Sequence, residues 1–132
     1  RTNNESLIDM PPLNINNRIQ FNKKEWSNLK LELQSEMVFR QNQFPNNNFV
    51  SNIVVDGNLV QVEIDISSPP QAYNLLHFSS DVNFKTSKNS FTTIGLSVFN
   101  IFNTKYRDYL NRQRFYADDL GRNIQIQVKI NF

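Results

Sequence analysis

Apolar and polar residues alternate without interruption over the last ten residues of the chain, from Asn123 to Phe132. Successive side chains of a β-strand point to opposite faces, so this alternation predicts a strand with one apolar and one polar face. The apolar positions are Ile124, Ile126, Val128, Ile130 and Phe132. The polar positions between them are Asn123, Gln125, Gln127, Lys129 and Asn131.

The same alternation recurs in four earlier segments. In the first of them only Asn17 interrupts the pattern. In the last of them Phe99 and Ile101 break the parity, so its register stays open. The predicted strands lie near 13–22, 28–41, 73–85, 91–103 and 122–132.

Segment 28–41 also has a helical interpretation. Its apolar residues from Trp26 to Met37 recur near helical spacing, and glutamate and lysine are good helix formers. The strict alternation of Leu29, Leu31 and Leu33, together with four similar segments, favours a strand.

Five such strands predict an all-β fold. Strands of about ten residues with one apolar and one polar face are typical of transmembrane antiparallel β-barrels. One-sided strands of a soluble sandwich or lipocalin-like domain show the same alternation and are the alternative. The chain has no run of about 18 apolar residues, which excludes a transmembrane helix but not a barrel.

The composition further limits the classes of protein to which the chain can belong. The chain has 132 residues, a net charge of +2 and no cysteine, so its size suits one domain or part of one, and no disulfide framework exists. The charge is too small to indicate a nucleic-acid partner. Because the sequence begins at Arg1 without a signal peptide, we expect a processed chain or a fragment.

The connections between the predicted strands alternate in length. Segments 22–27 and 86–90 are short, whereas 42–72 and 104–121 are long. Outer-membrane barrels have short periplasmic turns and long extracellular loops. The lengths therefore predict that 42–72 and 104–121 are extracellular and that the C-terminus lies at the periplasmic edge.

The first long connection contains a turn signal of its own. Asp56-Gly57 stands between apolar runs, which is a strong short-range signal for a β-hairpin. Residues 60–66 then alternate, and Pro69-Pro70 ends the extension. We therefore expect a hairpin at the tip of a projecting loop.

Aromatic residues cluster near both ends of the predicted strands. Phe21, Trp26 and Phe84 fall at the end with the short turns, and Phe39 and Tyr73 fall at the opposite end. Amphipathic rings settle at the two membrane interfaces of barrel proteins, so these residues are candidates for aromatic girdles.

Several local motifs surround the second long connection and the first and third strands. Around the second connection stand Asn100-Ile101-Phe102-Asn103, Tyr106-Arg107-Asp108-Tyr109 and Gly121-Arg122-Asn123. Before the two strands stand Met10-Pro11-Pro12 and Pro69-Pro70-Gln71-Ala72-Tyr73. Together with a last strand that ends in phenylalanine, these motifs resemble the C-terminal end of TonB-dependent outer-membrane receptors, where leucine is commoner at the position of Ile101.

This resemblance implies a barrel of about 22 strands that encloses a plug. Residues 1–132 would be the C-terminal part of that barrel, and the plug would not be contained in them. It implies TonB-energised uptake of a scarce nutrient, with a ferric siderophore or haem as the commonest ligand, and no enzymatic activity or resident cofactor. The implied partners are outer-membrane lipid, the remaining strands and plug, the TonB system, the assembly machinery and a surface lipoprotein. A passive porin or adhesin is the alternative, but a self-contained barrel needs an even number of strands.

The basic and aromatic residues of 104–121 are the candidate ligand contacts. Guanidinium groups and rings bind anionic chelates through charge-assisted bonds and stacking. The structural interpretation, in which the arginines pair with Asp108, Asp118 and Asp119, is favoured because the family has this segment with different ligands. The candidates are Tyr106, Arg107, Tyr109, Arg112, Arg114 and Tyr116.

Two further features of the sequence are weak indications of a catalytic or metal site, and a third concerns assembly into the outer membrane. His77, the only histidine, has the parity of the polar face, where a barrel-interior structural role is far commoner than a catalytic one. Asp118-Asp119 has no histidine or cysteine beside it that would complete a metal site. The resemblance implies that the last strand, with Ile124, Ile126, Val128, Ile130 and Phe132, is read by the outer-membrane assembly machinery.

Overall fold

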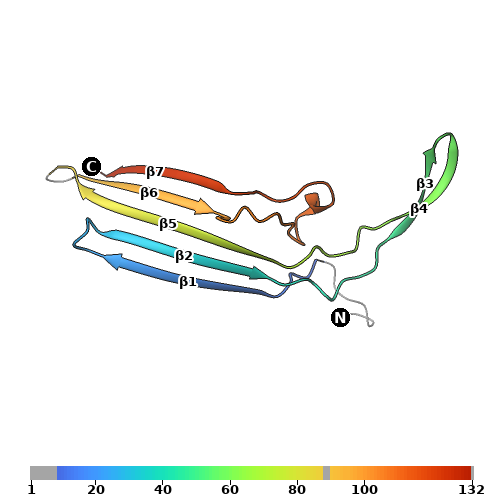
Figure 1. Ribbon diagram of the computed structural model, residues 1–132, viewed down its shortest axis with the longest axis horizontal. Helices are drawn as coiled ribbons and strands as arrows, with labels where there is room; N and C mark the ends of the chain where they lie inside the picture. The colour runs from blue at the N-terminus through green and yellow to red at the C-terminus, as the bar shows by residue number, and fades with distance from the viewer. Residues whose placement is uncertain (1–8, 88–89, 132) are drawn as a thin grey trace.

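The computed structural model describes residues 9–87 and 90–131 (Figure 1). Its main element is a five-stranded antiparallel sheet in the order β1-β2-β5-β6-β7, and β3 and β4 form a separate two-stranded sheet. The predicted all-β fold is confirmed, and the segment with a helical alternative is a strand. The strands are β1 (Asn14–Lys23), β2 (Leu29–Val38), β3 (Phe49–Val55), β4 (Asn58–Ile64), β5 (Tyr73–Lys85), β6 (Phe91–Phe99) and β7 (Asn123–Asn131).

The register places apolar residues in line across the whole sheet. Directly opposed residues of antiparallel strands point to the same face, so each row of partners can be followed from β1 to β7. One such row is Ile19, Leu33, Phe78, Val98 and Ile124. The next row on the other face is Gln20, Glu32, Ser79, Ser97 and Gln125. The sheet therefore has one apolar and one polar face.

Two strands end earlier than predicted. Strand β2 ends at Val38 rather than at 41, although the N–H of Phe39 still donates to Leu13 O at 2.9 Å. Strand β6 ends at Phe99 rather than at 103, because Asn100 adopts a left-handed conformation with φ 50°. This early end explains the parity break at Ile101, which lies outside the strand, whereas Phe99 lies within β6 on the polar face, opposite Asn123.

The two kinds of connection lie at opposite ends of the sheet. Figure 1 shows both short connections and the C-terminal end of β7 at one end, and both long connections at the other. This arrangement agrees with the predicted order of short and long connections. Among the described residues, no helix is long and apolar enough to span a membrane.

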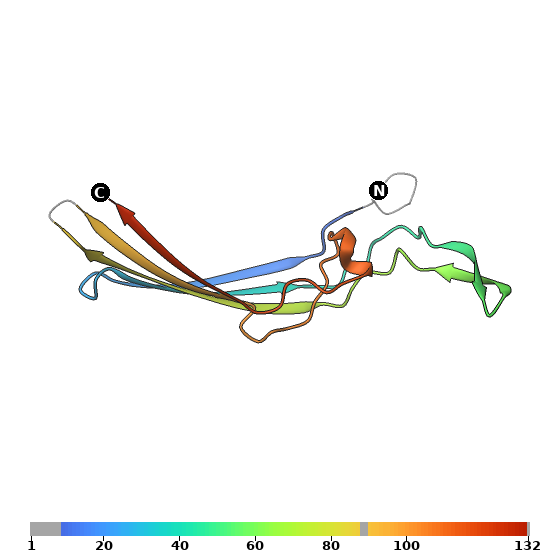
Figure 2. The ribbon, with the colours of Figure 1, turned by 90° about the horizontal axis from the view of Figure 1, so that it is seen from above.

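No second layer covers either face of the sheet in the part of the chain that the structure describes. The sheet is a single curved layer, as the view from above shows (Figure 2). The buried hydrophobic residues among those described are Val38, Leu75 and Tyr109, and all three lie near the end with the long connections. In contrast, Val128 in the middle of β7 is 61% exposed.

The predicted hairpin is present in the first long connection. Asp56 and Gly57 both have positive φ, at 51° and 80°, as a type I′ turn between β3 and β4 requires. At its base, Asn48 Oδ1 accepts the N–H groups of Ile66 and Ser67, and Asp65 Oδ1 accepts those of Ser67 and Ser68. Hydrogen bonds from the Ser68 side chain, and then from the N–H groups of Ser68 and Ser67, lower the pKa of the exposed Asp65 carboxyl.

Candidate functional site

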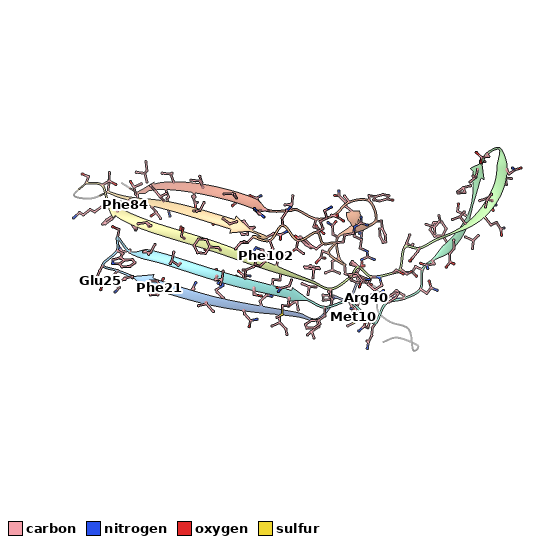
Figure 3. All side chains as sticks on the ribbon, viewed as in Figure 1. Met10, Phe21, Glu25, Arg40, Phe84 and Phe102 are labelled. Atoms are coloured by element: carbon pink, nitrogen blue, oxygen red, sulfur yellow. The ribbon has the colours of Figure 1, made fainter. Side chains whose placement is uncertain are left out.

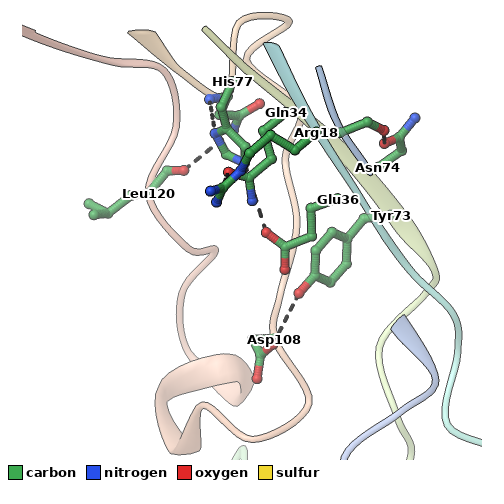
Figure 4. Close-up of polar contacts among 10 residues, drawn as sticks. Arg18, Gln34, Glu36, Tyr73, Asn74, His77, Asp108 and Leu120 are labelled. Atoms are coloured by element: carbon green, nitrogen blue, oxygen red, sulfur yellow. Dashed lines mark hydrogen bonds and ion pairs between the residues drawn. The ribbon is translucent and has the colours of Figure 1, made fainter. Parts of the chain in front are cut away.

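The second long connection is held to the sheet through Asn100. This residue is 3% exposed, its Nδ2 donates to Thr104 O at 2.9 Å, and its Oδ1 accepts the N–H of Thr104 at 2.9 Å. The same Nδ2 lies 3.4 Å from Leu120 O, near the far end of the connection (Figure 4). One side chain thus joins the beginning and the end of the loop.

His77, on the neighbouring strand β5, holds the backbone of Asn100 in place. The N–H of Asn100 donates to His77 Nδ1 at 3.2 Å, which leaves Nε2 to carry the ring proton. Nε2 faces Glu36 Oε2 at 3.8 Å (Figure 4). The ring centroid of Phe99 lies 5.7 Å from that of His77. The predicted polar-face position of His77 is confirmed, and its role in the structure is to support the loop.

A carboxylate network holds the middle of the loop. Asp108 accepts hydrogen bonds from the Tyr73 hydroxyl at 3.0 Å and from the N–H of Leu110 at 2.7 Å. Asp119 accepts bonds from the N–H of Asp108 and from Asn111 Nδ2, both at 2.7 Å. Each acid therefore satisfies several loop donors, and neither pairs with an arginine.

Tyr73 and Tyr106 form an aromatic pair beside this network. Their ring centroids are 4.6 Å apart, and burial raises the pKa of the Tyr106 phenol, with Asp119 adding to the shift. Tyr73 lies at the expected end of its strand but on the polar face, because its hydroxyl bonds the loop. It does not lie in the apolar band that was expected for a girdle residue.

Two arginines of the loop have internal partners. Arg107 Nε lies 2.7 Å from Asp118 Oδ1, and its Nη1 donates to Arg114 O at 2.8 Å. The Arg114 guanidinium stacks on Tyr109 at 4.3 Å and on Phe115 at 4.7 Å. The structural interpretation holds for Arg107, whereas Arg114 packs on rings.

The six candidate ligand contacts therefore separate into two groups. Tyr106, Arg107 and Arg114 line small hollows against the base of the first connection, of about 330 Å³ and 210 Å³, whereas Tyr109 is buried beneath them. Arg112 is exposed in the short 3₁₀ helix η1 (Arg112–Phe115), and Tyr116 is 88% exposed beside it. Arg107 is also exposed, but its guanidinium binds Asp118 and Arg114 O, so Arg112 and Tyr116 are the exposed candidates that lie outside the two hollows.

The other aromatic candidates lie near the two ends of the sheet (Figure 3). Phe21 and Phe84 are exposed on the apolar face near the short turns, and Lys23 Nζ lies 4.0 Å from the ring centre of Trp26. Phe39 is exposed just beyond β2. Of the proposed assembly residues, those from Ile124 to Ile130 are in β7, whereas Phe132 lies outside the described residues.

The metal interpretation of Asp118-Asp119 does not fit the geometry. Asp118 binds Arg107, and Asp119 binds loop donors, so the two carboxylates serve different partners. Within residues 9–87 and 90–131, no group of three histidine, cysteine or acidic side chains lies close enough to hold a metal ion.

The sequence did not predict the hydrogen bond between the Asn100 N–H and His77 Nδ1. An asparagine directly after an apolar strand is a signal for a left-handed turn, because asparagine tolerates positive φ better than most residues. The partner His77 lies 23 positions earlier, and only the register between β5 and β6 brings the two together.

No family model, curated protein or solved structure matches this chain.

Proposed function

We propose that this chain is the C-terminal part of the barrel of a TonB-dependent outer-membrane receptor, to which it contributes five of about 22 strands. The receptor takes up a scarce nutrient, most simply a ferric siderophore or haem, with energy from the TonB system. The observation that carries the proposal is the separation of apolar and polar rows over five consecutive strands of the sheet.

The exposed apolar face supports a lipid neighbour. Soluble monomers rarely expose apolar patches larger than a few hundred Å², and larger patches mark membrane or protein contacts. Here Ile19, Ile126 and Val128 are each more than half exposed, and they belong to rows that cross the sheet. A soluble sandwich would cover this face with a second layer, and the described residues contain none.

The two outer edges of the sheet support a larger assembly. Among the described strands, β1 pairs only with β2, and β7 pairs only with β6. In lipid, each unpaired backbone group costs several kcal/mol, so both edges need partner strands. Five strands are also too few to close a barrel, which needs at least about eight. The remaining receptor strands fit both requirements.

The positions of the connections support the orientation. Both long connections lie at one end of the sheet, where outer-membrane barrels carry their extracellular loops. On this proposal the polar face lines the interior and faces the plug. Exposed Arg112 and Tyr116 are the loop residues offered to a ligand, and the Asn100 joint holds the loop at the barrel rim.

Cysteine labelling on intact cells tests the orientation. In the full receptor, Asn58→Cys at the hairpin should react with a membrane-impermeant maleimide, because the hairpin would lie outside the cell. Lys24→Cys, in a short turn of similar exposure, should react only after the outer membrane is permeabilised. Labelling of Lys24→Cys but not of Asn58→Cys on intact cells would invert the orientation, and a receptor absent from the outer membrane would contradict the proposal.

A further inference from the structure

The β3–β4 hairpin stands apart from the main sheet (Figure 1). Among the described strands, β3 and β4 contact only each other. A two-stranded hairpin by itself is at best marginally stable in water, and a third strand or a packed neighbour is needed to hold it firmly. The hairpin is therefore an incomplete sheet with two open edges.

The register shows which backbone groups of β3 point away from β4. The turn bond of a two-residue hairpin joins Val55 to Asn58, so these two residues form a hydrogen-bonded pair. Hydrogen-bonded and non-bonded pairs alternate along an antiparallel ladder. The N–H and C=O groups of Val50, Asn52 and Val54 therefore point outward from the edge of β3.

The two edges of the hairpin differ in charge. Strand β3 contains no charged residue and no proline, and Val50 and Val54 are 63% and 69% exposed. Strand β4 carries Glu63 at an outward position, and charged side chains protect an edge against pairing. The edge of β3 is the one left open to another strand.

The faces and charges of the hairpin select what can pair there. On one face Phe49 lies opposite Ile64 and Ile53 lies opposite Val60, so an added strand would continue an apolar surface. Segment 41–72 contains three acidic residues and no lysine or arginine. Its negative field attracts basic segments and opposes acidic ones, including the hairpin of a second copy.

We propose that the β3 edge binds an extended polypeptide segment of another molecule, with alternating apolar and basic side chains, as an added antiparallel strand. The main-chain groups of Val50, Asn52 and Val54 supply the affinity, as in other cases of strand addition. The apolar side chains of the segment extend the face of Phe49 and Ile53, and its basic side chains respond to the acidic charge of the hairpin. This interaction goes beyond the proposed uptake function and does not depend on it, because it rests on the β3–β4 hairpin alone.

The test uses a fluorescent ten-residue peptide of alternating valine and lysine with blocked ends. Its binding to the full chain in nonionic detergent is followed by fluorescence anisotropy. Asn52→Pro removes an outward N–H at the β3 edge, and Gln61→Pro removes the equivalent outward N–H at the β4 edge. Proline is tolerated where the N–H faces solvent, so both variants should keep the hairpin.

Wild type and Gln61→Pro should bind the peptide, whereas Asn52→Pro should weaken binding by roughly tenfold or more. A tenfold weaker affinity corresponds to a loss of about 1.4 kcal/mol of binding free energy. Added salt should weaken binding, because the charge attraction is screened. A peptide with glutamate in place of lysine should bind less, and N-methylation on the edge facing β3 should abolish binding to unaltered protein.

Four results would overturn the proposal. Equal binding to wild type and Asn52→Pro would show that the peptide binds the micelle or another surface. A selective loss in Gln61→Pro would place the site on β4. Binding that survives N-methylation would exclude main-chain pairing even if a proline variant misfolded. A β3-dependent dimer without peptide binding would make a second copy the occupant.

Discussion

Val128→Arg will destabilise the proposed receptor in a bilayer by about 2–4 kcal/mol, whereas Gln127→Arg at the preceding position will change its stability little. Val128 lies in the middle of β7 on the apolar face, in line with Ile94 of β6. On the proposed barrel this position is at the lipid midplane, where a guanidinium loses its hydration and finds no partner. The two variants have the same charge and adjacent positions, so they differ only in the face they present.

The other face offers Gln127→Arg both space and a counter-charge. Gln127 lies opposite Gly95, and the polar hollow there has a volume of about 440 Å³ and is lined by Asp81 and Ser97. A guanidinium on this side stays in water and can approach the Asp81 carboxylate. The physical difference between the two variants is therefore the solvent on each face.

Reversible unfolding of the full receptor from lipid vesicles, followed by tryptophan fluorescence in urea, measures both effects. Gln127→Arg is the matched control for added bulk and charge. Equal midpoints for the two variants would contradict the assignment of the apolar face to lipid. A protein in which only Gln127→Arg is destabilised would have its faces reversed.

The strands could be predicted because the pattern that sets them is local. A strand whose two faces meet different surroundings has a strict period of two, and a slip of one residue would move every side chain to the wrong face. Segments 73–85 and 13–22 show this pattern, and β5 and β1 match them to within one residue. The Asp56-Gly57 turn was equally local, since few residue pairs tolerate two positive φ values.

The position of Tyr73 in the alternating pattern of its strand already indicates the face on which its ring lies. Tyr73 lies four positions before His77, so the period of two places both residues on the same, polar face. The expectation of a girdle role considered only its position along the strand axis. Its parity already indicated that its ring points away from the apolar side, toward the loop that contributes Asp108.

The arrangement of the loop could not be predicted in this way. Its partners are brought together by irregular backbone, for which no period exists. The sequence shows Arg107 and Arg114 near three aspartates, but only the folded loop decides that Asp118 takes the first and that Tyr109 and Phe115 stack on the second. Buried polar networks depend on complete geometry rather than on composition.

Asn100→Ala will loosen the second loop, because the side chain of Asn100 joins the beginning of the loop to its end. Removing the side chain leaves the N–H and C=O of Thr104 without their partner, at a cost of about 1–3 kcal/mol in a buried site. At φ 50° the Cβ of alanine approaches the following carbonyl oxygen, at a cost of about 1–2 kcal/mol, and alanine lacks the short polar side chain with which asparagine offsets this cost. Asn100→Gly removes the backbone strain but not the lost bonds, so it separates the two contributions.

Asn103→Gly is the matched control for this change. Asn103 has nearly the same φ, at 54°, and its Oδ1 accepts the N–H of Arg122, but it is exposed, so water can replace that bond. In folded receptor, trypsin should cleave after Arg112 and Arg114 fastest in Asn100→Ala, more slowly in Asn100→Gly, and at nearly the wild-type rate in Asn103→Gly. Because β6 and β7 pair through their own ladder, the sheet should stay protected in all three variants. If Asn100→Ala were cleaved no faster than Asn103→Gly, the side-chain bonds of Asn100 would have no part in the stability of the loop, which would then be held by its Asp108 and Asp119 bonds.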